Sequence, residues 1–94
     1  MNIFIASRLS NGNGLFPVEI HLNENNVTVK HPGLISGMEK SLPYSKITSV
    51  KIVSPVFGFS KIIITAYGLD TLLLEGFERR YAEEVKRLVD TKLK

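Results

Sequence analysis

The feature that most constrains this chain is a change in the spacing of its apolar residues at Gly76. Before that glycine, apolar and polar residues alternate in short runs, as Val18, Ile20 and Leu22 do with the polar residues between them. A period of two places the apolar side chains on one face of a strand, so it predicts half-buried β-strands. After Gly76 the apolar residues recur every three to four residues, which is the period of an α-helix. The chain is therefore predicted to be mainly β, with one helix at its C-terminal end.

Seven strands are expected before Gly76, joined by short connections. Asn, Gly and Pro residues mark the turns, because they favour tight turns or cannot continue a strand ladder. The predicted strands cover residues 2–7, 18–22, 27–31, 35–42, 47–53, 62–67 and 71–75. The segment 62–67 is almost continuously apolar and β-branched, which is typical of a strand buried on both faces. We therefore expect Ile63 to lie in the core.

The C-terminal helix is expected to span about residues 77–93. On a helical projection its apolar side chains, including Val85, fall on one side and its charged side chains on the other. The apolar side is suited to cover the open end of the strands and complete the core. We interpret the charged side as a solvent-exposed face, with an interaction surface as the alternative.

The number of strands and the chain length limit the architecture. Seven short strands in one open sheet would leave exposed edges and an uncovered apolar face. We therefore expect antiparallel strands in two packed sheets or a partly open barrel, closed by the C-terminal helix. A chain of 94 residues supplies one modest core, so residues 1–94 are expected to form a single domain.

This order of elements, seven strands and then one helix, resembles that of pleckstrin-homology-like domains, and in detail it is similar to their bacterial branch. The resemblance covers about residues 18–90, and its most distinctive part is Leu-Pro-Tyr-Ser-Lys-Ile-Thr-Ser-Val at residues 42–50, followed by a loop with Gly58. It implies a pleckstrin-homology-like fold that acts by binding at its surface. Lipid-binding members hold a phosphoinositide head group with several Lys and Arg around the first hairpin. The corresponding loop here carries only Arg8, so no multivalent phosphate clamp is predicted.

Composition and residue spacing exclude several kinds of site. The chain has no cysteine, and therefore no disulfide, thiolate metal ligand or cysteine nucleophile. No spacing suggests a nucleophile with its base and orienting group, so we expect a non-enzymatic protein without a cofactor. His21 and His31 lie on the two arms of one predicted hairpin, and we interpret them as exposed strand histidines rather than metal ligands.

The sequence also bears on where the protein acts. It contains no run approaching the ~20 apolar residues of a membrane span, and its first residues lack the features of a signal peptide. We therefore expect a cytoplasmic protein whose membrane contacts, where they exist, are peripheral.

The first of two candidate surfaces carries a mild positive charge. The formal net charge of +3 comes mainly from residues 27–61, which carry five lysines and one acidic residue. The candidate contacts to phosphate or lipid are Arg8, Lys30, Lys40, Lys46, Lys51 and Lys61. Because these cations are spread along the chain rather than clustered, nucleic acid is not an expected partner.

Apolar residues in two predicted loops form the other candidate surface. They are Leu15, Phe16, Val56, Phe57 and Phe59. Aromatic side chains exposed in loops can anchor a partner. The simpler interpretation is that Phe57 and Phe59 instead fold back over one end of the barrel, and the same choice applies to Leu15 and Phe16.

These two surfaces give two hypotheses for function. The preferred one is a binding or assembly module that recognises a protein partner, or a second copy of itself, through apolar loops and sheet edges. The alternative is a peripheral membrane adaptor, in which the lysines contact anionic lipid head groups and the aromatic loop inserts into the bilayer. The alternative requires the lysines to share one face of the domain.

Overall fold

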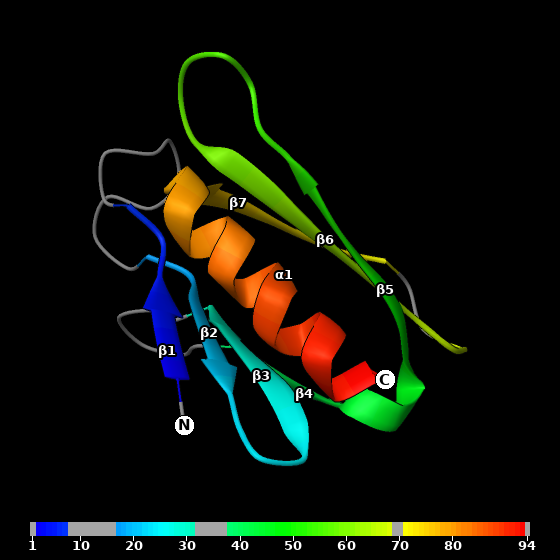
Figure 1. The fold of residues 1–94 in the computed structure, drawn as a ribbon. Helices are drawn as coiled ribbons and strands as arrows, with labels where there is room; N and C mark the ends of the chain where they lie inside the picture. Colours follow the sequence, from blue (N-terminus) through cyan, green and yellow to red (C-terminus); the bar gives the residue numbers. More distant parts are fainter. Residues whose placement is uncertain (1, 8–16, 32–37, 69–70, 94) are drawn as a thin grey trace.

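The computed structural model describes residues 2–7, 17–31, 38–68 and 71–93, where seven antiparallel strands form two sheets and a helix follows them (Figure 1). The first sheet contains, in spatial order, β1 (Asn2–Ile5), β2 (Glu19–Leu22), β3 (Asn26–His31) and β4 (Met38–Pro43). The second contains β5 (Ile47–Val53), β6 (Ser60–Ala66) and β7 (Leu72–Phe77). A short 3-10 helix, η1 (Tyr44–Lys46), joins the sheets, and the C-terminal helix is α1 (Arg79–Leu93).

The structure confirms the predicted architecture, a mainly β fold with seven antiparallel strands and one C-terminal helix. The strands form two separate sheets, and within the described residues the sheets do not close into a barrel. One backbone hydrogen bond, from Ser7 N–H to the Gly76 carbonyl at 2.8 Å, links the end of the first sheet to the second. The helix lies across the space between the two sheets (Figure 1).

A single core forms between the sheets and α1. The helix packs mainly against β5, and Val85 is completely buried, as the sequence predicts. The largest fully buried side chains are those of Phe77, Ile20, Ile62, Ile64, Leu74, Val27, Val29, Val85 and Val89. They come from both sheets and from the helix, so the three parts of the fold depend on one another.

The helix begins later than its apolar spacing predicts. Phe77 is the last residue of β7, pairs with Ser60 and is completely buried, whereas α1 starts at Arg79. Gly76 has a φ of 94°, a left-handed conformation that glycine adopts without steric cost. This kink, next to a register shift between Ser60 and Lys61, keeps Phe77 in the strand and aims it into the core.

Strand β6 is buried on one face only, so the prediction of burial on both faces is wrong. Ile62 and Ile64 are completely buried, whereas Ile63 between them is half-buried. Ile63 pairs with Lys51 on β5 and Leu73 on β7, and these three side chains lie on the outer face of the second sheet, away from α1. Tyr67 lies beyond the strand and is exposed.

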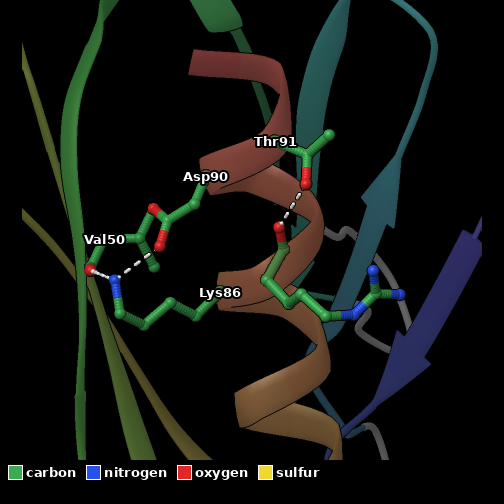
Figure 2. A network of polar contacts seen from close by, with 5 residues as sticks. Val50, Lys86, Asp90 and Thr91 are labelled. Carbon is green, nitrogen blue, oxygen red and sulfur yellow. Dashed lines mark hydrogen bonds and ion pairs between the residues drawn. The ribbon is translucent and has the colours of Figure 1, made fainter. Parts of the chain in front are cut away.

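Polar contacts tie α1 to the second sheet and to itself. Lys86 Nζ donates to the backbone carbonyl of Val50 at 3.0 Å and to Asp90 Oδ2 at 2.8 Å, so one ammonium group joins the helix to β5 (Figure 2). On the outer side of the helix, Arg87 donates to the carboxylate of Glu84, and this lowers the pKa of Glu84. Much of the charged side of α1 is therefore paired within the helix.

Candidate functional site

The connection between β5 and β6 carries the most exposed large apolar side chains among the described residues. We call residues 54–59 the hairpin tip. Val56 is 90% exposed and Phe57 is 89% exposed, while Phe59 is half-buried. The alternative in which both phenylalanines fold back over the sheets is therefore wrong for Phe57.

The conformation of the hairpin tip follows from its sequence. Ser54 Oγ and Ser60 Oγ lie 2.7 Å apart and share a hydrogen bond that closes the base of the tip. Gly58 has a φ of 100°, which allows the chain to turn where a residue with a Cβ would be strained. Pro55 fixes its own φ angle by its ring. The tip projects past the first turn of α1, at the end of the domain opposite the C-terminus (Figure 1).

Exposed apolar surface continues from the tip onto β5. Val53, the last residue of that strand, is 50% exposed and pairs with Lys61 of β6. Lys61 pairs in turn with Glu75 of β7, and its Nζ lies 3.4 Å from Glu75 Oε1. The lysine that follows the tip in the sequence therefore already has an acidic neighbour.

The described lysines do not converge on one face. Lys30 lies on the outer face of the first sheet, directly between Glu19 of β2 and Glu39 of β4. Lys40 pairs with the buried Val29 and therefore lies on the opposite face of that sheet.

The remaining lysines lie on other parts of the fold. Lys51 and Lys61 share the outer face of the second sheet, and Lys46 lies in η1 at the far end of β5 from the tip. Three other predicted site residues, Arg8, Leu15 and Phe16, lie outside the described residues. Of the predicted phosphate contacts that the structure describes, only Lys51 and Lys61 therefore share a face. Lys61 already forms an ion pair with Glu75.

Sequence reasoning missed a polar network on the outer face of the first sheet. His21 Nε2 lies 2.9 Å from Glu19 Oε1, and only 13% of the His21 side chain is exposed, so its interpretation as an exposed histidine is wrong. Beside it, Thr28 is buried and shares hydrogen bonds with Asn23 at 3.2 Å and Ser41 at 2.8 Å. His31, by contrast, is exposed.

This network does not form a metal centre. No group of three His, Asp or Glu side chains in the described part of the chain is arranged to hold a metal ion. The alternation of polar residues along β2 and β3 was the available signal for the network, but only the strand register shows which of them meet.

A polar hollow of about 370 Å³ lies at the other end of the domain from the hairpin tip. Its lining includes Glu24, Tyr44 and Lys92. The Tyr44 hydroxyl donates to the Asn23 backbone carbonyl at 2.7 Å, and burial raises the pKa of Tyr44. The hydrogen bond holds the turn between β2 and β3 against η1.

Comparison with known protein families, with curated proteins and with solved structures finds no significant match to this chain. Among the helices of the described residues, none combines the length and the apolar character needed to cross a membrane.

Proposed function

We propose that this protein is a non-enzymatic protein-binding module of the pleckstrin-homology-like type, and that its hairpin tip enters an apolar pocket on a partner protein. The observation that carries this proposal is the exposure of Val56 and Phe57, at 90% and 89%, on a projecting turn. Scattered exposed apolar residues are ordinary on protein surfaces. Val56 and Phe57, by contrast, are adjacent in the hairpin tip and lie next to Phe59 and Val53. Such a group of apolar side chains is the kind of anchor around which protein interfaces form.

The built-in geometry of the tip supports a binding role. The hydrogen bond between Ser54 and Ser60 and the ring of Pro55 each restrict the tip before any partner arrives. Binding by a restricted segment loses less conformational entropy than binding by a flexible one. The tip is thus suited to enter a preformed pocket with its anchor side chains already in position.

The charge distribution favours a protein pocket over an anionic membrane. Residues 54–60 carry no charge, and each lysine held near an anionic bilayer contributes only about 1 kcal/mol. Lys61 beside the tip is paired with Glu75, and Lys30 lies between two glutamates. Lys46 lies at the other end of β5. The lysines of the described residues therefore offer little unpaired positive charge to accompany the tip onto a lipid surface.

Site-specific photo-crosslinking in the natural host tests the proposal. The photoreactive analogue p-benzoylphenylalanine replaces Phe57 in one variant and Tyr67, an exposed aromatic residue at the other end of β6, in the matched control. We expect one discrete protein adduct from position 57 that position 67 does not give, and binding of the purified, identified protein to the wild-type domain. Identical adduct patterns from both positions would contradict the proposal.

Flotation with vesicles separates the membrane alternative from the protein-binding proposal. The vesicles contain phosphatidylcholine with increasing phosphatidylserine, at low and at physiological salt. We expect the protein to remain unbound under all these conditions. Flotation that rises with phosphatidylserine, falls with salt and is lost in the double variant Phe57→Ser, Phe59→Ser would replace the protein pocket by a lipid surface.

A further inference from the structure

The outer edge of β1 carries backbone groups that no described residue pairs with. β1 is the first strand of its sheet and pairs only with β2. Ala6 N–H, just beyond β1, donates to the Val18 carbonyl at 2.8 Å. Because hydrogen bonding alternates along an antiparallel pair, Phe4 also directs its N–H and C=O toward β2. The N–H and C=O groups of Ile3 and Ile5 therefore point away from the sheet.

β1 also differs in composition from the other edge strands. Sheet edges are commonly protected from further pairing by charged residues or proline. The other edges of the two sheets follow this rule: β4 contains Glu39, Lys40 and Pro43, β5 contains Lys51, and β7 contains Glu75. The sequence of β1 is Asn-Ile-Phe-Ile, with no charge and no proline. Among the described edge strands, β1 alone lacks this protection.

We propose that β1 pairs antiparallel with β1 of a second copy of this chain, about a two-fold axis at Phe4. In this register Ile3 lies opposite Ile5 of the second copy, and Ile5 lies opposite Ile3. Both are hydrogen-bonded pairs, so the outward N–H and C=O groups of all four isoleucines find partners. The two first sheets then join into one continuous sheet.

The side chains of β1 favour a second copy as the occupant of this edge. Ile3 is 51% exposed and Ile5 is 48% exposed, and they lie on the outer face of the sheet, where their neighbours on β2 are the polar His21 and Glu19. A strand added beside β1 therefore needs apolar residues at two alternate outer positions. β1 of a second copy brings the same two isoleucines, with no charge on either side.

The edge of β1 beside α1 supplies a second fit. Phe4 contacts Tyr81 of α1, with ring centroids 6.1 Å apart, and a hollow of about 320 Å³ is lined by Ile3, Phe4, Ile5 and Tyr81. In the proposed register the two Phe4 residues face each other in a non-hydrogen-bonded pair, where side chains approach most closely. The Phe4 ring of the second copy therefore meets an open, partly apolar hollow beside Phe4 of the first copy.

The small size of this contact predicts a weak dimer. A pairing of four residues from each copy buries less than the roughly 1,200–2,000 Å² of a standard stable interface, so dimerisation should depend on concentration. The surface is separate from the hairpin tip, so this inference does not depend on the proposed function. The variant Phe57→Ser should dimerise as the wild type does.

Sedimentation equilibrium of the purified chain tests the inference, from about 10 µM to about 1 mM, where weak dimers are populated. We expect a monomer–dimer equilibrium in the wild type. The variant Ile5→Pro, which removes an outward N–H without breaking the pairing with β2, should remain monomeric. The double variant Ile3→Lys, Ile5→Lys should also remain monomeric, because each dimer would hold four lysines on adjacent strands.

Val53→Lys is the matched control, because Val53 is also an exposed strand residue, at 50%, but lies on the other sheet. This variant should dimerise like the wild type. A wild type that stays monomeric up to the highest concentration would overturn the inference. Equal dimerisation of the β1 variants and the wild type would overturn it as well.

A cysteine experiment tests the register itself, because the natural chain contains no cysteine. The variants Ile3→Cys and Ile5→Cys are oxidised separately and as a mixture. We expect the mixed disulfide to form faster than either disulfide between identical chains, since directly opposite residues have Cα atoms about 5.5 Å apart, within disulfide range. Faster formation of a disulfide between two identical chains would rule out the register centred on Phe4.

Discussion

The hairpin formed by β5 and β6 carries apolar side chains both at its base, around Val50 and Ile64, and at its tip. The two regions place these side chains in opposite environments. At the base, Val50 is 3% exposed and Ile64 is completely buried. At the tip, Val56 and Phe57 are about nine-tenths exposed. The difference comes from α1, which packs on β5 and reaches the Val50 carbonyl through Lys86, whereas the tip extends past the helix (Figures 1 and 2). Position relative to the helix, rather than hydropathy, decides which apolar residues form the core.

This comparison implies a division of roles along one hairpin. The base should determine the stability of the fold, and the tip should contribute little to it. Apolar side chains that do not stabilise the fold remain available to bind another molecule. Substitutions at the base should therefore destabilise the fold far more than substitutions at the tip.

The largest effect is expected from Val85→Asp in the part of α1 that faces the base. Val85 is completely buried, so aspartate there would place an unpaired charge in the core. We expect a loss of about 4 kcal/mol or more, a large fraction of the stability of a domain of this size, and an unfolded far-ultraviolet circular dichroism spectrum. The same change at the tip, Val56→Asp, should leave the spectrum and the melting temperature as in the wild type. A cooperatively folded Val85→Asp protein would refute the assignment of the base as core.

An intermediate effect is expected from Ile63→Asp, on the outer face of β6. Ile63 is half-buried between Lys51 and Leu73, so the new carboxylate keeps access to water and gains a cation beside it. We expect a loss of about 1–2 kcal/mol in urea denaturation, with the fold retained.

The neighbouring change Ile64→Asp is the control for Ile63→Asp, because Ile64 is completely buried on the inner face. It should unfold the protein. Equal losses for the two variants would show that β6 is buried on both faces after all.

A smaller effect is expected from Tyr44→Phe, where η1 leads into the far end of β5. The variant loses the hydrogen bond from the Tyr44 hydroxyl to the Asn23 carbonyl, which corresponds to about 1 kcal/mol. Burial raises the pKa of Tyr44 above its ordinary value of 10.0, so the folded state holds this proton more tightly than the unfolded state does. The stability that Tyr44 contributes is complete below the pKa that Tyr44 has in the unfolded chain. It is lost as the pH rises through the pKa that Tyr44 has in the folded state.

The pH dependence gives Tyr44→Phe a specific readout. Urea denaturation at several pH values should show a shallower decline of stability above about pH 10 in the variant than in the wild type. An unchanged alkaline decline would mean that Tyr44 is as accessible to water in the folded state as in the unfolded chain.

The smallest effect on stability is expected from the double variant Val56→Ser, Phe57→Ser. Both side chains are almost fully exposed, so their removal should change the free energy of unfolding by no more than about 0.5 kcal/mol. Thermal melting monitored by circular dichroism measures this directly. A loss comparable to that of Ile63→Asp would show that the tip packs on the fold, and the division between base and tip would fail.

The sequence predicted the elements of this fold well, because its signals are local. Alternation over residues 18–22 and 47–53, and the helical spacing after Gly76, depend on neighbours within one strand or one turn. The end of β7 was misplaced because Phe77 fits the apolar side of the helix as well as it fits a strand. The backbone conformation of Gly76, which decides between the two, is not visible in hydropathy.

The candidate site was less accessible to sequence reasoning because it depends on pairing between distant strands. The residues of the loop around Phe57 were identified, but their exposure depends on how far α1 extends along the hairpin. Placing Lys30 between two glutamates requires the register of β2, β3 and β4, and placing Lys61 beside Glu75 requires the register of β6 and β7. A slip of one residue in that register would move each lysine to the other face of its sheet.

Calorimetric titration of the protein captured at position 57, with the wild type and with the double variant Val56→Ser, Phe57→Ser, measures whether the hairpin tip is the binding site. The double variant should bind at least about tenfold more weakly, a loss of about 1.4 kcal/mol or more, with an unchanged melting temperature. Equal affinity of the two proteins for that partner would contradict the assignment of the hairpin tip as the binding site.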